Sequence, residues 1–320
     1  MTTTVVERAE RLAPDQVDQV LTLMGAAGDA DGAFPLSEHV VLHIRHGGEA
    51  PAVHLFARVH GELVGYAHVD TTDAVEGASA ELAVHPLHRR RGLGRALVLA
   101  AIAVADERAD GRLRLWAHGD HPSASALAIS LGFERFRMLW QLRRSLFAPV
   151  PEPTLPPGVV VRPFRPGVDD AAWLALNAAA FADHPEQGRW TLDDLRARLD
   201  EPWFDPAGFL LATDAEGTML GFHWTKVHGE VHTHPHPASE DAPHAHEPIG
   251  EVYVLGVSPA AAGSGLGAAL TLAGLRYLRG RGLDQAMLYV DESNHRAAAL
   301  YQRLDFVRWS TDVLFRRFPD

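Results

Sequence analysis

The sequence predicts an α/β protein built from two copies of one fold, and three observations support this prediction. Sliding one half over the other by 173 residues aligns 78–133 with 251–306 without a gap. In each half an apolar strand runs through a proline into a glycine-rich turn and then a helix. Between the halves, residues 148–158 hold five prolines in eleven positions, which favours an extended connection and excludes helix. The chain is therefore interpreted as a tandem duplication.

The length of 320 residues suits two domains, each large enough to bury its own core. We expect a first domain over 1–148, a proline-rich linker over 149–158 and a second domain over 159–320. In each half the pattern of apolar residues and turns predicts a mixed central sheet flanked by helices.

The expected elements are similar in the two halves. In the first half they are a hairpin over 53–59 and 63–70, a strand over 79–86, a helix over 92–108, a strand over 113–118 and a further helix. In the second half they are a hairpin over 208–214 and 219–227, a strand over 250–259, a helix over 265–280, a strand over 286–291, a helix over 295–304 and a final segment over 305–318.

Composition excludes several classes of function. The chain has no cysteine, which rules out disulfides, thiolate metal sites and a cysteine nucleophile. Its net charge of -12 argues against nucleic acid as the main partner, because phosphate binding favours a basic domain. No long apolar run or signal-peptide pattern is present, so we expect a cytoplasmic protein without a membrane partner. We also expect a monomer, although no sequence pattern sets the oligomeric state.

The glycine-rich turns predict a site for phosphate groups. A helix that opens on glycine after such a turn presents backbone N–H groups at the positive end of its dipole. Arg89, Gly92 and Gly94 form the turn pattern of the first half, and Gly265 and Gly267 repeat it in the second. A Gly-x-Gly pattern on its own more often serves only close packing of strand and helix. A P-loop is excluded because the Gly-Lys-Ser/Thr sequence is missing.

Strand "LAVHP", turn "HRRRGLGRAL" and the later "SLGF" resemble the acetyl-CoA motif of the GNAT N-acetyltransferase superfamily. The resemblance implies two tandem GNAT acyl-CoA N-acyltransferase folds, each with a sheet splayed at its central strand. It implies acetyl-CoA as the donor substrate and no required metal. The implied acetyl-CoA contacts are Leu82, Ala83, Val84, Arg89, Arg90, Gly92, Gly94 and Arg95 in the first half, and Leu255, Gly256, Val257, Ala262, Gly263, Ser264, Gly265, Leu266, Gly267, Ala268, Asn294 and Arg296 in the second. Ala262 departs from the motif, which has Arg or Gln there.

The two halves differ where acyl transfer would need catalytic groups. Glu251 aligns with Ala78, and Tyr301 aligns with Ala128. Transfer of an acyl group to an amine needs a base, donors for the carbonyl oxygen and an acid for the thiolate. Glu251 can serve as the base and Tyr301 as the acid. Without a catalytic role, Glu251 would be an acid at a solvated strand end and Tyr301 a tyrosine of the core. The first half is then a degenerate, mainly structural copy that still has a turn for acetyl-CoA.

Segments "DHPEQGRW", "GFHWTKVH", "GEVYVLGVSP" and "LYVDESNHRAAALYQRLDF" resemble the mycothiol synthase family of actinobacteria over nearly the whole chain. That family acetylates the cysteinyl amine of 1-D-myo-inositol 2-(L-cysteinylamino)-2-deoxy-α-D-glucopyranoside. The resemblance implies Glu251 as general base and Tyr301 as general acid. The implied substrate contacts are Glu38, Glu186, Lys226, Glu251 and Tyr289. The glutamates could instead be loop or first-turn acids, and Lys226 a strand-edge charge.

Residues 228–247 hold six of the 19 histidines in a polar, proline-rich stretch. Its His-x-His spacings can ligate zinc or nickel, but a solvated insertion is the favoured interpretation, and a substrate lid is a hypothesis. Three other functions stay open. They are a GNAT enzyme for an aminoglycoside, polyamine or protein N-terminus, a non-catalytic acyl-CoA sensor, and a histidine-rich metal-handling protein.

Overall fold

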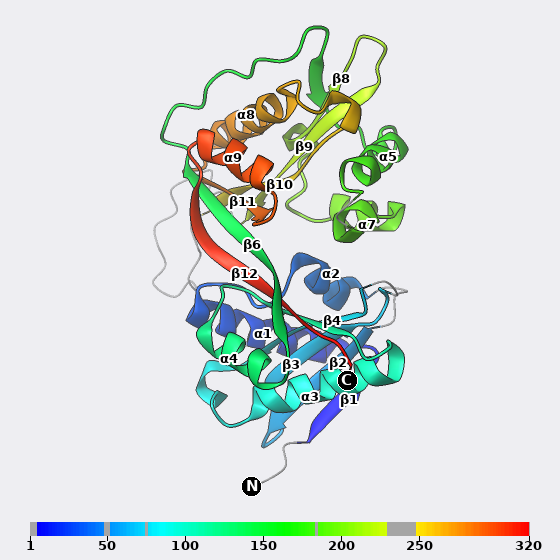
Figure 1. Cartoon of the computed structure of the whole chain (residues 1–320), viewed down its shortest axis with the longest axis vertical. Helices are drawn as coiled ribbons and strands as arrows, with labels where there is room; N and C mark the ends of the chain where they lie inside the picture. Colours follow the sequence, from blue (N-terminus) through cyan, green and yellow to red (C-terminus); the bar gives the residue numbers. More distant parts are fainter. Residues whose placement is uncertain (1–4, 48–51, 74–75, 183–184, 229–247, 320) are drawn as a thin grey trace. The chain divides into compact units, whose positions relative to one another are not determined.

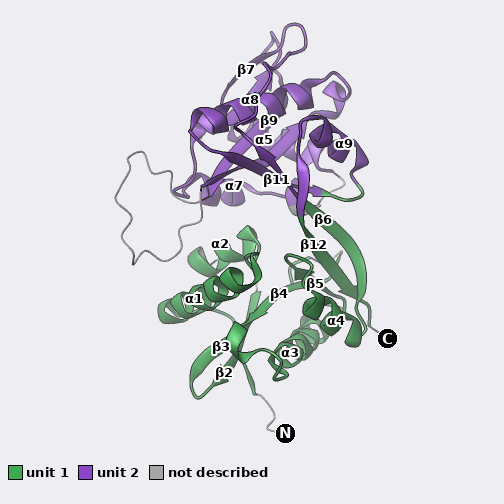
Figure 2. Cartoon of the chain, turned by 90° about the vertical axis from the view of Figure 1, so that its left-hand side faces the viewer, with its two compact units in different colours: residues 1–140, 291–293, 310–320 green, residues 141–290, 294–309 purple. Residues whose placement is uncertain are grey.

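The computed structural model describes residues 5–47, 52–73, 76–182, 185–228 and 248–319. The chain forms two compact units, coloured separately in Figure 2. Unit 1 comprises 1–140, 291–293 and 310–320, and unit 2 comprises 141–290 and 294–309. None of the helices in the described ranges is long and apolar enough to cross a membrane.

These units divide the chain at different places from the boundaries expected at the proline-rich linker. Strand β6 (Glu134–Ser145) supplies 134–140 to unit 1 and 141–145 to unit 2. Strand β12 (Val307–Arg317) begins in unit 2, but its residues from Ser310 onward belong to unit 1. The last strand of the sequence thus completes the unit formed by the first half.

Unit 1 contains a sheet in the order β1-β2-β3-β4-β5-β12-β6. Neighbours β1 to β4 are antiparallel, β4 and β5 are parallel, and β12 is antiparallel to β5. Its other elements are β1 (Val6–Ala9), α1 (Pro14–Asp31), α2 (Glu38–His46), β2 (Ala52–Val59), β3 (Glu62–Asp70), β4 (Ala78–Val84), α3 (Leu93–Arg108), β5 (Leu113–Ala117) and α4 (Pro122–Ser130).

Unit 2 repeats this plan in the strand order β6-β11-β10-β9-β8-β7. Its central strands β10 and β11 are parallel, and β10, β9, β8 and β7 are antiparallel to one another in turn. Its other elements are β7 (Val160–Pro163), α5 (Asp170–Ala180), α6 (Pro185–Gly188), α7 (Leu192–Leu199), β8 (Phe209–Thr213), β9 (Met219–His228), β10 (Ile249–Val257), α8 (Leu266–Gly280), β11 (Gln285–Asp291) and α9 (His295–Arg303).

The strands and helices expected around the glycine turns are confirmed. The helices expected over 92–108 and 265–280 are α3 and α8, and the strand expected over 250–259 is β10. Strand β6 was not expected, because arginines at close spacing interrupt its apolar alternation. Most of the final segment forms strand β12, whose residues from Ser310 onward belong to unit 1.

Each sheet buries its two faces differently. In unit 2, Figure 1 shows α8 and α9 on one side of β9 and β10, and α5 and α7 on the other. The α5 and α7 side is aromatic: the ring of Phe209 stacks on Trp224 at 4.2 Å, and Trp173 meets both edge to face. All three side chains are fully buried, so this layer supplies much of the apolar burial of the unit.

The equivalent side of unit 1, under α1 and α2, combines an apolar cluster with buried ionisable groups. Glu81 on β4 accepts hydrogen bonds from the backbone N–H and the hydroxyl of Ser37, at the start of α2. His118 places Nε2 3.5 Å from Glu81 Oε2 and Nδ1 3.0 Å from Asp312 Oδ2. Although burial alone would lower it, the bonds to Asp312 and Glu81 raise the pKa of His118 to about 10.

Three further histidines of unit 1 are held neutral. The rings of His43, His54 and His68 lie 5.2 to 6.0 Å apart, and His54 pairs with the Tyr66 hydroxyl at 2.7 Å. Burial, with a contribution from His43, lowers the pKa of His54 to about 4 and that of His68 well below its usual range. In unit 2, burial likewise lowers the pKa of His223 to about 4.

We predict that thermal stability is greatest near pH 6.5 and falls on both sides. In the unfolded chain, His54 and His223 bind protons as the pH falls through about 6.5. In the folded protein they remain neutral until about pH 4, so the free energy of unfolding decreases over this range. As the pH rises toward 10, the unfolded chain has lost the proton that folded His118 retains, so stability decreases again. Calorimetry across this range measures both slopes.

His118→Gln is the matched variant for the alkaline side of this profile. It should flatten the decline above about pH 6.5 and leave the acid decline in place. A melting temperature of the unaltered protein that climbs steadily with pH above neutrality would contradict this interpretation of the Glu81, His118 and Asp312 cluster.

Candidate active site

The central strand of each unit is longer than its pairing with the parallel neighbour. In unit 2, β10 pairs with β9 as far as Val257, but it pairs with β11 only at Gly250 and Glu251. Among the described strands, nothing pairs with this edge of β10 beyond Glu251. In unit 1, β4 pairs with β5 as far as Glu81 and with β3 as far as Val84. The predicted acetyl-CoA edges, 82–84 and 255–257, therefore both lie beyond the last parallel pair.

Left-handed glycines shape the turn that follows β10. Gly263 and Gly265 each have a φ of +86°, and a Cβ at either position would meet nothing within 4 Å. Gly265 is the N-cap of α8, whose first-turn N–H groups have no partner within the helix. Ala262 and Ser264 lie in the same turn. The other predicted contacts, Leu266, Gly267 and Ala268, form the first turn of α8.

The same geometry recurs in unit 1, where Gly92 is the left-handed N-cap of α3. A Cβ on Gly94 would lie 3.3 Å from Leu127 and 3.9 Å from Val84, as one on Gly267 would lie 4.0 Å from Leu300 and 3.7 Å from Val257. Arg90 and Arg95 are exposed beside this turn. Arg89 instead donates two hydrogen bonds to Asp31, at 2.6 and 2.8 Å, and one to the Val84 carbonyl.

Helix α9 brings three predicted residues to unit 2. Asn294 is its N-cap, and its side-chain oxygen accepts a hydrogen bond from the Ala297 N–H. Arg296 is exposed in the first turn. Tyr301 is buried with its ring against Phe306, and burial raises its pKa to about 12, so the hydroxyl is protonated at neutral pH. That hydroxyl has no hydrogen-bond partner among the described residues.

Glu251 lies at the last parallel pair of β10 and is only 7% exposed. Its Oε2 is 2.6 Å from Nε2 of His228 at the end of β9. Among the described residues, Oε1 has no hydrogen-bond partner. One oxygen of this buried carboxylate is thus held by an imidazole, and the other can accept a proton.

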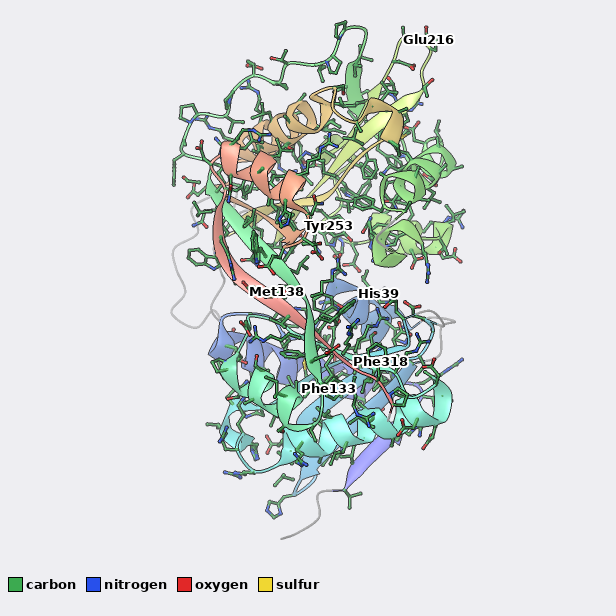
Figure 3. All side chains as sticks on the ribbon, viewed as in Figure 1. His39, Phe133, Met138, Glu216, Tyr253 and Phe318 are labelled. Atoms are coloured by element: carbon green, nitrogen blue, oxygen red, sulfur yellow. The ribbon has the colours of Figure 1, made fainter. Side chains whose placement is uncertain are left out.

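Lys226 faces Glu251 across the β9–β10 pairing and is also buried. Its ammonium lies 4.6 Å from the ring centre of Trp203 and 5.3 Å from that of Tyr253, which are cation–π distances. The strand register shifts at Tyr253, the extra residue of a β-bulge, a device that re-aims side chains. Figure 3 labels Tyr253 well away from Glu216, which marks the hairpin tip between β8 and β9.

The remaining predicted substrate contacts have different surroundings. Tyr289 on β11 is 40% exposed, and its hydroxyl accepts a hydrogen bond from Gln141 at 2.8 Å. Glu186 lies in α6, which is tied to α5 by two hydrogen bonds between Asn177 and Gln187. Glu38 opens α2 in unit 1. The structure thus groups Glu251, Lys226 and Tyr289 on the central strands of unit 2.

His228, Trp203 and Tyr253 contact Glu251 or Lys226, although the sequence patterns do not predict these contacts. The signal for His228 is its spacing of two from Lys226, one residue beyond the strand expected over 219–227; because β9 extends to His228, both side chains lie on one face. His228 is also the first histidine of the stretch 228–247. The rest of that stretch lies outside the described residues. Among the described residues no cluster of three or more His, Asp or Glu could hold a metal ion.

Comparison with known proteins defines the class. The model of the acetyltransferase (GNAT) family matches residues 28–133 and 173–306, one segment in each half. The chain therefore belongs to the GNAT acetyltransferase family, as its glycine-turn motifs predict, and it carries that fold twice. Membership implies acetyl-CoA as the acetyl donor.

Relatives narrow the comparison to one kind of GNAT protein. The chain is 60% identical to the mycothiol acetyltransferase of Salinispora arenicola over 98% of this chain and 96% of that one. It is 51% identical to the mycothiol acetyltransferase of Streptomyces coelicolor over 97% and 94%. Among solved structures, a tandem GNAT protein from the clavulanic acid biosynthesis pathway has a TM-score of 0.73 at 22% identity and covers 99% of this chain and all of its own. That likeness confirms the tandem fold.

We predict that Gly265→Ala weakens acetyl-CoA binding by about tenfold, because the new Cβ would occupy the space in front of the α8 N–H groups. Gly282→Ala is the matched control, since Gly282 also has a positive φ and open space but lies beyond the other end of α8. Each variant should lose about 1 kcal/mol of stability. Isothermal titration with acetyl-CoA measures the difference, and equal affinities for the two variants would contradict the assignment.

Proposed function

We propose that the chain transfers the acetyl group of acetyl-CoA to the cysteinyl amine of 1-D-myo-inositol 2-(L-cysteinylamino)-2-deoxy-α-D-glucopyranoside, which yields mycothiol. The observation that carries this proposal is the 60% identity to a mycothiol acetyltransferase over nearly the full length of both chains. Unit 2 also has a carboxylate, Glu251, and a phenol, Tyr301, which suit the direct transfer of an acetyl group to an amine.

Acetyl-CoA supplies an activated thioester when bound. The unpaired edge of β10 at 255–257 suits its pantetheine arm, which can pair with backbone groups as an added strand would. The turn 262–265 and the first turn of α8 suit its pyrophosphate. Asn294 and Arg296 lie at the start of α9 and are proposed to contact the same substrate. An N–H at Gly256 or Val257 would polarise the thioester carbonyl.

Glu251 is the proposed general base. Its Oε1 would take a proton from the substrate ammonium, directly or through a water molecule. An α-amino group has an ordinary pKa of about 8, so a carboxylate need remove the proton from only part of the population at neutral pH. Burial beside Lys226 keeps bulk water away from this step.

Tyr301 is the proposed general acid. Burial holds its pKa at about 12, so it carries its proton at neutral pH. Since its hydroxyl is not engaged by another described residue, it can donate that proton to the departing thiolate. The proposed base and acid thus come from different elements, Glu251 from β10 and Tyr301 from α9.

Four further residues are proposed to bind the sugar, inositol and cysteinyl groups: Glu38, Glu186, Lys226 and Tyr289. Charged and phenolic side chains suit such a substrate because each can form more than one hydrogen bond to hydroxyl groups. Lys226 and Tyr289 share the central strands of unit 2 with Glu251, which supports their assignment.

Unit 1 is proposed to be non-catalytic, although it has a turn that suits acetyl-CoA. It has alanine at the positions of both Glu251 and Tyr301. The carboxylate of Glu81 is engaged by Ser37 and His118, so it does not replace the missing base. We further propose that the protein acts as a monomer in the cytoplasm and requires no metal.

A mass-spectrometric transfer assay tests the substrate directly. The protein and acetyl-CoA are offered the cysteinyl-glucosaminyl-inositol beside glucosaminyl-inositol, free cysteine and an aminoglycoside. Selective acetylation of the first compound is expected. Acetylation of another amine would replace the proposed acceptor, and acetyl-CoA binding without any transfer would favour a sensor.

We predict that Glu251→Gln lowers kcat/KM for the acceptor about 100-fold or more, and that Tyr301→Phe lowers kcat by about 10-fold or more, because each removes a proton-transfer group. Both variants should bind acetyl-CoA with the affinity of the unaltered protein. Steady-state kinetics with calorimetric binding measures the two effects separately. Full turnover by both variants would rule out these roles.

A further inference from the structure

The carboxylate of Glu251 is held by a residue outside the roles described above. His228 Nε2 lies 2.6 Å from Glu251 Oε2, which is a short distance for a hydrogen bond to a charged group. His228 is the final residue of β9, and about a third of its side chain is exposed. The imidazole is therefore partly in solvent, whereas the carboxylate that it holds is buried.

The strand register explains why His228 reaches this carboxylate. Glu251 is opposite Lys226, and Ile249 is opposite His228, so His228 is the diagonal neighbour of Glu251. Lys226 and His228 are two residues apart on one strand and so share a face of the sheet with Glu251. Two basic side chains thus flank the same carboxylate.

The two neighbours have different contacts. The Lys226 ammonium lies over the rings of Trp203 and Tyr253. His228 alone among the described residues donates a hydrogen bond to Glu251. A buried carboxylate without a donor is costly. The imidazole of His228 is therefore the described group that holds the Glu251 carboxylate in place.

We propose that His228 is a positioning residue for acetyl transfer: its Nε2–H donates to Glu251 Oε2, fixes the carboxylate and turns Oε1 toward the acceptor amine. This inference rests on the proposed function, because it takes Glu251 as the base. His228 itself acts through Glu251 and touches neither acetyl-CoA nor the reacting amine.

Two substitutions separate the hydrogen bond from the ring. His228→Leu removes the donor and keeps an apolar side chain of similar reach. His228→Gln keeps an N–H near the position of Nε2 and does not titrate. The leucine variant should lose on the order of tenfold in kcat, and the glutamine variant should recover most of it. Acetyl-CoA affinity should stay unchanged in both.

The pH profile distinguishes positioning from a merely structural role. Lys226 is opposite Glu251 on β9, and the neighbouring titratable groups on the central strands include Tyr253 on β10 and Tyr289 on β11. Arg198 on α7 donates from Nε to the Tyr253 hydroxyl. In His228→Leu these groups are unchanged. The acid limb of kcat/KM should move to higher pH in this variant and return toward its original position in His228→Gln.

His60→Asn is the control, since His60 lies in an exposed turn between β2 and β3 of unit 1. It should leave kcat and the pH profile unchanged. An unaltered kcat and acid limb in His228→Leu would overturn the proposal. So would equal losses in the leucine and glutamine variants, because these would trace the effect to packing.

A measurement on the free protein keeps this inference separate from the choice of acceptor. The ¹⁵N resonances of the His228 ring, identified by their loss in His228→Gln, are compared between the unaltered protein and Glu251→Gln. The pairing predicts that the His228 resonances shift and those of His60 do not. Unshifted His228 resonances would overturn the pairing even if the acceptor is acetylated. If no amine is acetylated but the resonances shift, the proposed function fails while the contact stands.

Discussion

An unpaired strand edge is the constraint on which the rest of the site depends. Beyond Glu251, strand β10 has β9 on one side and no strand on the other among the described residues. Backbone groups along 252–257 can therefore meet an extended ligand arm. Because β10 and β11 stop pairing at Glu251, this residue lies at the start of the unpaired segment, and the glycine turn follows its end. Helix α9, which follows β11, brings Tyr301 into the same unit.

The two units bury the sheet face opposite α3 and α8 with different side chains, although both have an apolar cluster there. Unit 2 covers the face with aromatic rings and places Lys226 against two of them. Unit 1 has Glu81, His118 and Asp312 there, joined to the start of α2 through Ser37. Asp312 comes from the C-terminal strand, so the cluster needs both ends of the sequence. The first copy has thus kept the turn while its buried carboxylate serves the fold.

Local patterns in the sequence predicted most of the fold. Alternation and glycine turns predicted β10, α8 and their counterparts. The internal repeat singled out Glu251 and Tyr301 as candidates, because both align with alanine in the first half. Such local patterns do not predict which distant segments pair with one another. The final segment, 305–318, follows the second half in the sequence, yet its Val313 pairs in β12 with Ala117 of the first half. The contact of His228 with Glu251 depends on strand register, and the Glu81 cluster depends on three segments meeting.

A crystal structure with a non-reactive acetyl-CoA analogue and the cysteinyl-glucosaminyl-inositol would locate both substrates. We expect the analogue along β10, its sulfur near the Tyr301 hydroxyl and the acceptor amine within about 3 Å of Glu251 Oε1 or one water away. The amine in unit 1 beside Glu81, or an arm paired with any strand but β10 in unit 2, would contradict it.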